Sequence, residues 1–159
     1  MIKYCYDKWN ANQYRLRAWL RNETGLNGCC YKDLVKATVT YILNDGLTEP
    51  LFCGEYWDAN KITEIDNGDY QGTLLYLIPM DTYQPSECEY LMTYVGYGSC
   101  SGCDTLQHIQ MLCDYSDEEH LTEQQIEDMM RLCKDIVCSM IKPYNTGWRY
   151  SADFDTVDF

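Results

Sequence analysis

Residues 94–107 constrain the fold more than any other segment, because a strand pattern there runs into a Cys-x-x-Cys turn and out into a helix start. Gly98 and Gly102 flank and fill this turn. Glycine adopts positive φ at little steric cost, so we expect the backbone to fold tightly at this point. The pattern therefore predicts that the sulfur atoms of Cys100 and Cys103 lie close together.

The helix that leaves the turn is predicted from its first residues. Asp104 is typical of an N-cap, and Gln107 three positions later completes a pair that resembles a capping box. The first backbone N–H groups and the positive end of the helix dipole then lie near Cys103, which favours its thiolate form. A thiolate pair is what a metal ion or a redox reaction would use.

An antiparallel hairpin is expected to deliver this turn. Residues 73–80 and 89–97 are apolar runs rich in strand-forming side chains, and residues 81–87 between them have the composition of a hairpin loop. Antiparallel pairing places the start of the first strand, at residues 69–71, beside the end of the second, at residues 98–100. The Asp-Tyr-Gln segment should therefore lie next to the Cys-x-x-Cys turn.

The remaining patterns predict a single α+β domain, with helices before and after a small antiparallel sheet. Residues 1–46 are expected to form a basic helical part, 47–103 the sheet with its turn, 104–143 two helices, and 144–159 an acidic and aromatic tail. A capping box of Thr122 with Gln125 makes the last helix the clearest. The elements besides the hairpin are expected at residues 7–22, 31–43, 51–57, 61–65, 104–113 and 122–142.

Length and cysteine content bound the class of protein. A chain of 159 residues has the size of one domain and is long enough to bury a substantial core. No window approaches the ~18 apolar residues that a membrane span needs, and the first residues lack the pattern of a secretory signal. We therefore expect a cytoplasmic location, where the ten cysteines are thiols. Their even number keeps disulfides as the alternative.

The net charge of −13 is unevenly distributed along the chain. Residues 1–46 carry seven Lys and Arg against four Asp and Glu, net +3, whereas residues 47–159 carry five against twenty-one, net −16. The larger part would repel phosphates, which disfavours nucleic acid and favours a basic protein partner. Fifteen tyrosines offer rigid contact area to such a partner. The alternative is that the acidity only keeps the protein soluble.

Acidic side chains of residues 114–128 and of the tail are the candidate partner-binding residues. They combine negative charge with neighbouring tyrosines, the two features by which a basic surface is recognised. The candidates are Asp117, Glu118, Glu119, Glu123, Asp128, Asp153 and Asp155.

Three interpretations of the Cys-x-x-Cys turn stay open. In the first, Cys100 and Cys103 supply half of a tetrahedral structural zinc site, because two intervening residues let both sulfurs reach one ion at about 2.3 Å. No second ligand pair is present, so isolated residues must supply the other half. The candidates for it are Cys53, His108, Asp66, Asp69 and Cys5.

In the second interpretation, the strand, turn and helix start match the local pattern of a thioredoxin active site, which makes a thiol–disulfide oxidoreductase the alternative function. A thioredoxin-type fold needs a parallel β-α-β unit before the motif, and none is predicted. In the third, both cysteines are small residues in a tight loop. No other catalytic motif is found, and two histidines offer little material for acid–base catalysis.

Two motifs carry a resemblance to a known family. Gly68-Asp-Tyr-Gln-Gly72 and Gly96-Tyr-Gly-Ser-Cys-Ser-Gly-Cys-Asp104 resemble the signatures of a family of small bacteriophage and prophage proteins, over about residues 66–107. In size and acidity the chain is also similar to the anti-CRISPR proteins, and to a zinc-containing inhibitor of a type II RNA-guided nuclease in particular. The resemblance implies a phage-encoded inhibitor without catalytic activity. Its partner would be a type II CRISPR effector in the cytoplasm of a bacterial host, whose DNA loading or cleavage it blocks.

Overall fold

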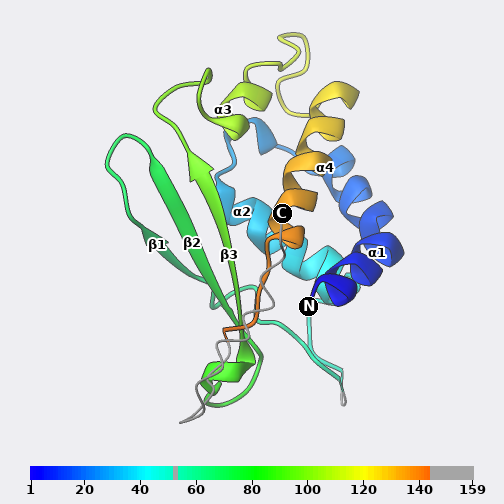
Figure 1. The fold of residues 1–159 in the computed structure, drawn as a ribbon. Helices are drawn as coiled ribbons and strands as arrows, with labels where there is room; N and C mark the ends of the chain where they lie inside the picture. Colours follow the sequence, from blue (N-terminus) through cyan, green and yellow to red (C-terminus); the bar gives the residue numbers. More distant parts are fainter. Residues whose placement is uncertain (52–53, 144–159) are drawn as a thin grey trace.

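A three-stranded antiparallel sheet packed against helices is the framework of the protein (Figure 1). The computed structural model describes residues 1–51 and 54–143. Helices α1, α2 and α4 lie on one side of the sheet, and the short helix α3 lies at the end where β3 finishes. The predicted α+β class, with helices before and after a small antiparallel sheet, is confirmed.

The first helix, α1, spans Ile2–Asn22 and so begins earlier than the predicted residue 7. Cys5 and Trp9 are both buried, and they extend its apolar stripe toward the N-terminus. Leu16 and Leu20 continue the stripe and are wholly buried. Burial of a leucine side chain contributes about 1.5–3 kcal/mol, so this face anchors the helix to the core.

The second helix, α2, spans Tyr31–Thr38 and continues directly as a π-helical turn over Val39–Leu43. Together they confirm the helix predicted over residues 31–43. The chain leaves this helix through Asp45 and Gly46, whose φ angles of 57° and 78° are both in the left-handed region. A glycine adopts that conformation without strain, which is why the helix ends there.

The sheet has the order β1-β2-β3, with β1 at Thr63–Asp66, β2 at Gly72–Pro79 and β3 at Tyr90–Tyr97. Both pairs are antiparallel, and Gly72 lies opposite Tyr97. The predicted hairpin is therefore confirmed. The strand expected at residues 61–65 is also present, and it begins two residues later and ends one residue later, at Thr63–Asp66. The face toward the helices is formed by buried side chains, among them Tyr76, Ile78, Leu91, Thr93 and Val95.

The strand expected at residues 51–57 is wrong for the part of it that the structure describes. Trp57 makes only an isolated bridge to Met80. Its backbone N–H donates to Asn44 Oδ1 over 3.0 Å, and its carbonyl oxygen accepts from Asn44 Nδ2 over 2.8 Å. A buried side chain thus satisfies the groups that a neighbouring strand would otherwise pair, so no ladder is needed here.

The last two helices follow the Cys-x-x-Cys turn. Helix α3 spans Thr105–Gln110, shorter than the predicted 104–113, and α4 spans Glu123–Cys138. The capping box of Thr122 and Gln125 is confirmed, since the Gln125 N–H donates to Thr122 Oγ1 over 3.2 Å and the Thr122 N–H donates to Gln125 Oε1 over 3.0 Å. No helix in the described residues is both long and apolar enough to cross a membrane.

Candidate functional site

The Cys-x-x-Cys turn closes as the sequence predicts. The Cys103 N–H donates to the Cys100 carbonyl oxygen over 3.0 Å, and the Asp104 N–H donates to the same oxygen over 2.9 Å. These bonds bring the two sulfur atoms to 3.2 Å from each other, with both cysteines exposed. A dithiol at this separation is open to reagents, to metal ions and to oxidation.

Gly98 is required in this turn by close packing and not by its φ angle. A Cβ atom at this position would lie 2.5 Å from both the sulfur and the carbonyl oxygen of Cys103, far inside van der Waals contact. Among the described glycines only Gly25, Gly46 and Gly54 have positive φ, so the expected left-handed backbone at Gly98 and Gly102 is wrong. Gly98, directly after β3, instead packs closely against Cys103.

Asp104 holds the turn to three parts of the fold. It is 4% exposed, and its carboxylate accepts from the Gln107 N–H over 2.9 Å and from the Gly98 N–H over 3.1 Å. The predicted N-cap is therefore confirmed. The same carboxylate accepts from the Tyr31 hydroxyl over 3.0 Å, and that hydroxyl accepts from the Leu106 N–H over 3.1 Å. Helix α2, the end of β3 and the start of α3 thus meet at one buried carboxylate.

The Asp-Tyr-Gln-Gly loop packs beside this turn, as the hairpin predicted. A Cβ on Gly68 would lie 2.1 Å from the Gln71 carbonyl oxygen and 2.9 Å from the Gly72 Cα, so the loop closes only with glycines at both ends. Asp66 Oδ1 accepts from the Gly68 N–H over 2.9 Å and from the Tyr97 hydroxyl over 2.8 Å. Tyr70, at the tip, is 84% exposed.

The thiol chemistry of the turn is asymmetric. The hydrogen bond with the Cys100 thiol, followed by the bond to the Cys100 backbone, lowers the pKa of Cys103 below that of an ordinary thiol. The thiolate is the nucleophile and the metal-binding form, so the lowered pKa makes Cys103 more reactive than an ordinary thiol. Elsewhere, burial raises the pKa of Cys5 and of Cys29 to about 11, which makes these thiols poor nucleophiles.

Among the described residues, only Cys100 and Cys103 of the candidate zinc ligands come together. Within residues 1–51 and 54–143, no group of three or more His, Cys, Asp and Glu is arranged to hold a metal ion. His108 is exposed on α3 and Cys5 is buried in α1, so neither joins the pair, and the same holds for Asp66 and Asp69. Cys53 lies outside the described residues.

Two sulfurs bound to a tetrahedral zinc at about 2.3 Å lie about 3.8 Å apart. The observed separation of 3.2 Å between Cys100 Sγ and Cys103 Sγ is therefore close to what one ion would need from this pair. The pair fits two ligand positions, and no further ligand is assigned from the described residues.

The predicted partner-binding acids divide into two groups. Asp117 contacts His120 at 3.2 Å, Glu123 contacts Arg21 at 2.9 Å, and Asp128 contacts Arg131 at 2.9 Å, so these three already have side-chain partners within the chain. Glu118 and Glu119 are exposed, and their side chains have no partner within the part of the chain that the structure describes. The candidates Asp153 and Asp155 lie outside the described residues.

Two ion pairs join α1 to α4, and they involve two of the seven basic residues of the N-terminal part. Arg21 contacts Glu123 through two hydrogen bonds of 2.9 and 3.0 Å, and Arg17 contacts Glu127 in the same two-pronged manner. These hydrogen bonds lower the pKa of both glutamates. The basic side of α1 therefore neutralises α4, an outcome that helix periodicity alone did not indicate.

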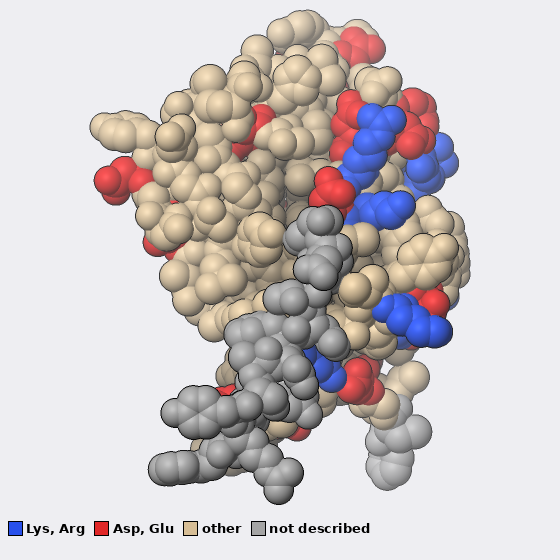
Figure 2. All heavy atoms as spheres, in the orientation of Figure 1, with Lys and Arg blue, Asp and Glu red and all other residues tan. Residues whose placement is uncertain are grey.

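The charge pattern is more extreme than the division at residue 46 suggests. No Lys or Arg occurs between Lys61 and Arg131, whereas fourteen Asp and Glu do. This stretch, called here the acidic segment, forms the whole sheet, α3, the loop before α4 and the first half of α4. Figure 2 shows the consequence on one face: most of the blue side chains lie over the helices, and the sheet side of this face carries only acidic and uncharged residues.

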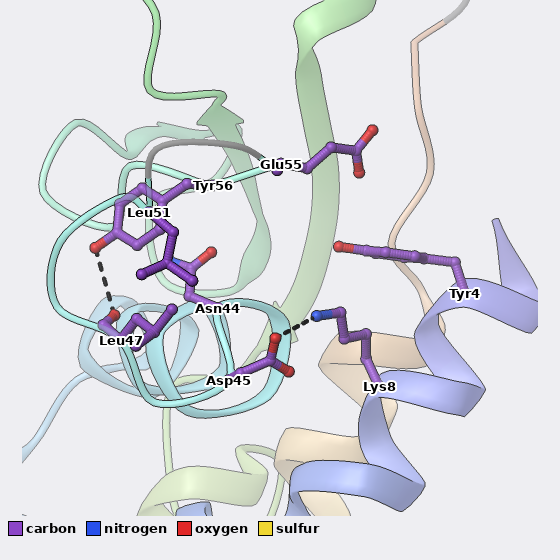
Figure 3. Close-up of a pocket in the computed structure, with 9 residues that line it drawn as sticks. Tyr4, Lys8, Asn44, Asp45, Leu47, Leu51, Glu55 and Tyr56 are labelled. Carbon is purple, nitrogen blue, oxygen red and sulfur yellow. Dashed lines mark hydrogen bonds and ion pairs between the residues drawn. The ribbon is translucent and has the colours of Figure 1, made fainter.

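Two hollows in the described surface were not predicted from the sequence. The first, of about 330 Å³, lies between α1 and residues 44–56 (Figure 3). Of its charged residues, Lys8 and Asp45 pair with each other over 2.8 Å and Glu55 contacts Lys142 at 3.4 Å, so each of these charges already has a partner. The second, of about 390 Å³, lies between β1, α2 and α3, close to the Asp104 carboxylate. We call it the tyrosine pocket, because Tyr31, Tyr76 and Tyr97 all line it.

Comparison of the chain with family models, with curated proteins and with solved structures found no match.

Proposed function

We propose that this protein acts by binding a basic partner, and that the partner is a type II CRISPR effector nuclease whose DNA loading or cleavage it blocks. The observation that carries the proposal is the acidic segment, with fourteen acids and no Lys or Arg between Lys61 and Arg131. A surface of a single sign attracts an opposite one over several ångströms and speeds association. Effector channels are positively charged because they hold a guide RNA and its target DNA.

The surface of the acidic segment also supplies the contacts of an interaction protein. Tyr70, Tyr83 and Tyr115 are 84%, 98% and 83% exposed, and all three belong to this segment. Exposed tyrosines provide large, rigid contact area and are enriched in binding hot spots. Glu118 and Glu119 lie close in sequence to Tyr115 and keep their charges available, since no side chain in the described ranges pairs with them. The contacts of the Asp104 carboxylate with α2, the end of β3 and the start of α3, called here the Asp104 clamp, keep these elements in place.

The experiment mixes the protein with a panel of type II effector–guide complexes and measures co-elution and target cleavage at low and raised salt. We expect one complex to bind, cleavage to stop at about one protein per effector, and binding to weaken at raised salt because screening reduces the attraction. Absence of binding to every effector would contradict the proposal. Inhibition by far less than one equivalent would indicate an enzyme instead.

Two charge-reversal variants separate a local surface from bulk charge. The double variant Glu118→Lys with Glu119→Lys removes the two unpaired acids of the loop before α4. Its control, Glu23→Lys with Glu49→Lys, changes the net charge equally at exposed sites outside the acidic segment. We expect the first variant to lose inhibition and the second to keep most of it. Equal losses would show that no local surface of this loop is recognised.

A structural zinc bound by Cys100 and Cys103 remains a prediction of the turn. When bound, the ion would cross-link the end of β3 to the start of α3 and stabilise the fold. Elemental analysis of protein purified without chelator should give about one equivalent per chain, and Cys100→Ser should lose it. Cys53→Ser tests whether that residue completes the site. Metal-free protein whose melting is unchanged by chelator would contradict the prediction.

The exposed thiol pair, with the lowered pKa of Cys103, favours a thiol–disulfide oxidoreductase as the second candidate function. The Cys103 thiolate would attack a substrate disulfide and release one thiolate, and the Cys100 thiolate would then attack Cys103 Sγ and release the other. The protein is left with a Cys100–Cys103 disulfide and the substrate with two thiols. Cys100→Ser should trap the mixed disulfide, and the wild type should reduce insulin when a dithiol regenerates it.

A further inference from the structure

The tyrosine pocket contains a buried polar group that nothing in the described residues satisfies. Tyr76 lies in the central strand β2, is 0% exposed and is one of the residues that line the pocket; its hydroxyl is closed to solvent and has no hydrogen-bond partner of ordinary geometry in the described ranges. An unpaired buried hydroxyl costs about 1–3 kcal/mol. Burial raises the pKa of Tyr76, and the carboxylate of Glu64, its neighbour across the β1–β2 pair, raises it further. The hydroxyl therefore stays protonated and can both donate and accept a hydrogen bond.

The charges around the pocket favour a cation. Glu64 and Asp66 project from the edge strand β1 and are exposed, and Asp104 lies deeper, whereas Lys32 is the basic residue among the lining side chains. The formal charge of the lining is therefore −2. Asp104 already accepts three hydrogen bonds, but Asp66 uses only Oδ1, and the Glu64 carboxylate interacts only with the Tyr76 hydroxyl in the described part. Two carboxylates at the mouth thus keep acceptor capacity for a ligand.

The walls of the pocket are apolar and aromatic. Leu74 and Leu106 line it together with the rings of Tyr31, Tyr76 and Tyr97. Such walls suit the aliphatic stem of a side chain, and tyrosine rings attract a cation placed over their faces. A volume of about 390 Å³ lies within the range of sites that hold small ligands or single side chains.

We propose that the tyrosine pocket receives an arginine side chain of a basic protein partner; this extends the proposed function by naming the group that the partner inserts. A guanidinium is planar, stacks on aromatic rings and pairs with carboxylates through two hydrogen bonds, so Glu64 and Asp66 match its geometry better than that of an ammonium. The Tyr76 hydroxyl is closed to solvent in the free protein, so the remaining N–H groups of the guanidinium reach it only if the pocket opens as the arginine enters. The pocket borders the Asp-Tyr-Gln-Gly loop through Asp66, so the arginine would enter beside the exposed Tyr70.

The first test uses the isolated protein and a small probe, so its outcome is independent of any nuclease. N-acetyl-argininamide is titrated into labelled protein while amide resonances are followed by NMR, and N-acetyl-citrullinamide serves as the neutral analogue of the same shape. We expect saturable shifts around β1 and the end of β3. Loss of the charge-assisted hydrogen bonds should weaken the citrulline analogue about tenfold or more. Equal binding of both probes, or no saturable shift, overturns the proposal.

Two variants then test the residues. Tyr76→Phe removes the unpaired hydroxyl, so we expect weaker probe binding with a melting temperature that is unchanged or raised. Glu64→Gln should also weaken binding, whereas Glu49→Gln, an exposed control far along the chain, should not. A Tyr76→Phe variant that binds the probe like wild type contradicts the role of the hydroxyl.

The second test separates this proposal from the proposed function. If Tyr76→Phe and Glu64→Gln bind an effector complex as tightly as wild type, the pocket is not the partner's arginine site, while inhibition itself still stands. If the probe binds the pocket but no effector binds the protein, the nuclease proposal fails and a basic partner of another kind is indicated. Loss of effector binding in both variants, with probe binding lost in parallel, supports both.

Discussion

Replacement of Asp104 by alanine should unfold the region around the Cys-x-x-Cys turn. The N-cap bond to the Gln107 N–H is worth about 1 kcal/mol. The buried Gly98 N–H would be left without an acceptor, which costs about 1–3 kcal/mol. The Tyr31 hydroxyl loses its acceptor as well, although it still accepts from the Leu106 N–H. We therefore expect Asp104→Ala to lower the free energy of unfolding by about 3 kcal/mol.

Urea unfolding followed by tryptophan fluorescence measures this change, and Thr122→Ala is the matched control. Thr122 caps α4 through its side chain but holds no other element together, so its loss should cost only about 1 kcal/mol. Asp104→Asn keeps the shape but replaces one acceptor with a donor, and should fall between the two. For a domain of this size, 3 kcal/mol corresponds to a melting temperature lower by about 6–12 °C. An Asp104→Ala variant no less stable than Thr122→Ala would refute the clamp.

Three further predictions concern Gly98, Cys103 and Asn44. Gly98→Ala should destabilise the protein by about 1–3 kcal/mol in thermal melts, because the new methyl group overlaps Cys103, whereas Gly96→Ala meets nothing within 4 Å and should be neutral. The pH at which Cys103 is alkylated at half its maximal rate, measured by mass spectrometry, should be lower in wild type than in Cys100→Ser, because the Cys100 hydrogen bond lowers the pKa of Cys103. Equal midpoint pH values would contradict this. Asn44→Ala removes both side-chain hydrogen bonds to the backbone of Trp57 and should lower the free energy of unfolding by about 2–4 kcal/mol in urea. A decrease below about 0.5 kcal/mol would contradict this role of Asn44.

Local patterns predicted most of the elements around the candidate site. The N-cap at Asp104, the capping box at Thr122 and the hairpin over residues 73–97 depend on side chains within a few positions of the backbone they control, or on a simple alternation. The structure confirms each of them. The strand expected at residues 51–57 failed because Asn44, outside that window, supplies the hydrogen bonds of Trp57.

The fold alone decided which distant residues meet. Tyr31 reaches Asp104 from a helix 73 residues away in the chain, and Arg21 reaches Glu123 across 102 residues. Neither contact has a spacing that could be read in advance, since the first depends on where α2 and the start of α3 lie in the packed fold and the second on how α1 packs against α4. The tyrosine pocket has the same origin, because β1, α2 and α3 bring its charged and aromatic side chains together only when the core is packed. Sequence by itself determined the acidic charge, the thiol turn and the N-caps of α3 and α4, which are properties of neighbouring residues. Packing decided which charges are neutralised and where a ligand could enter.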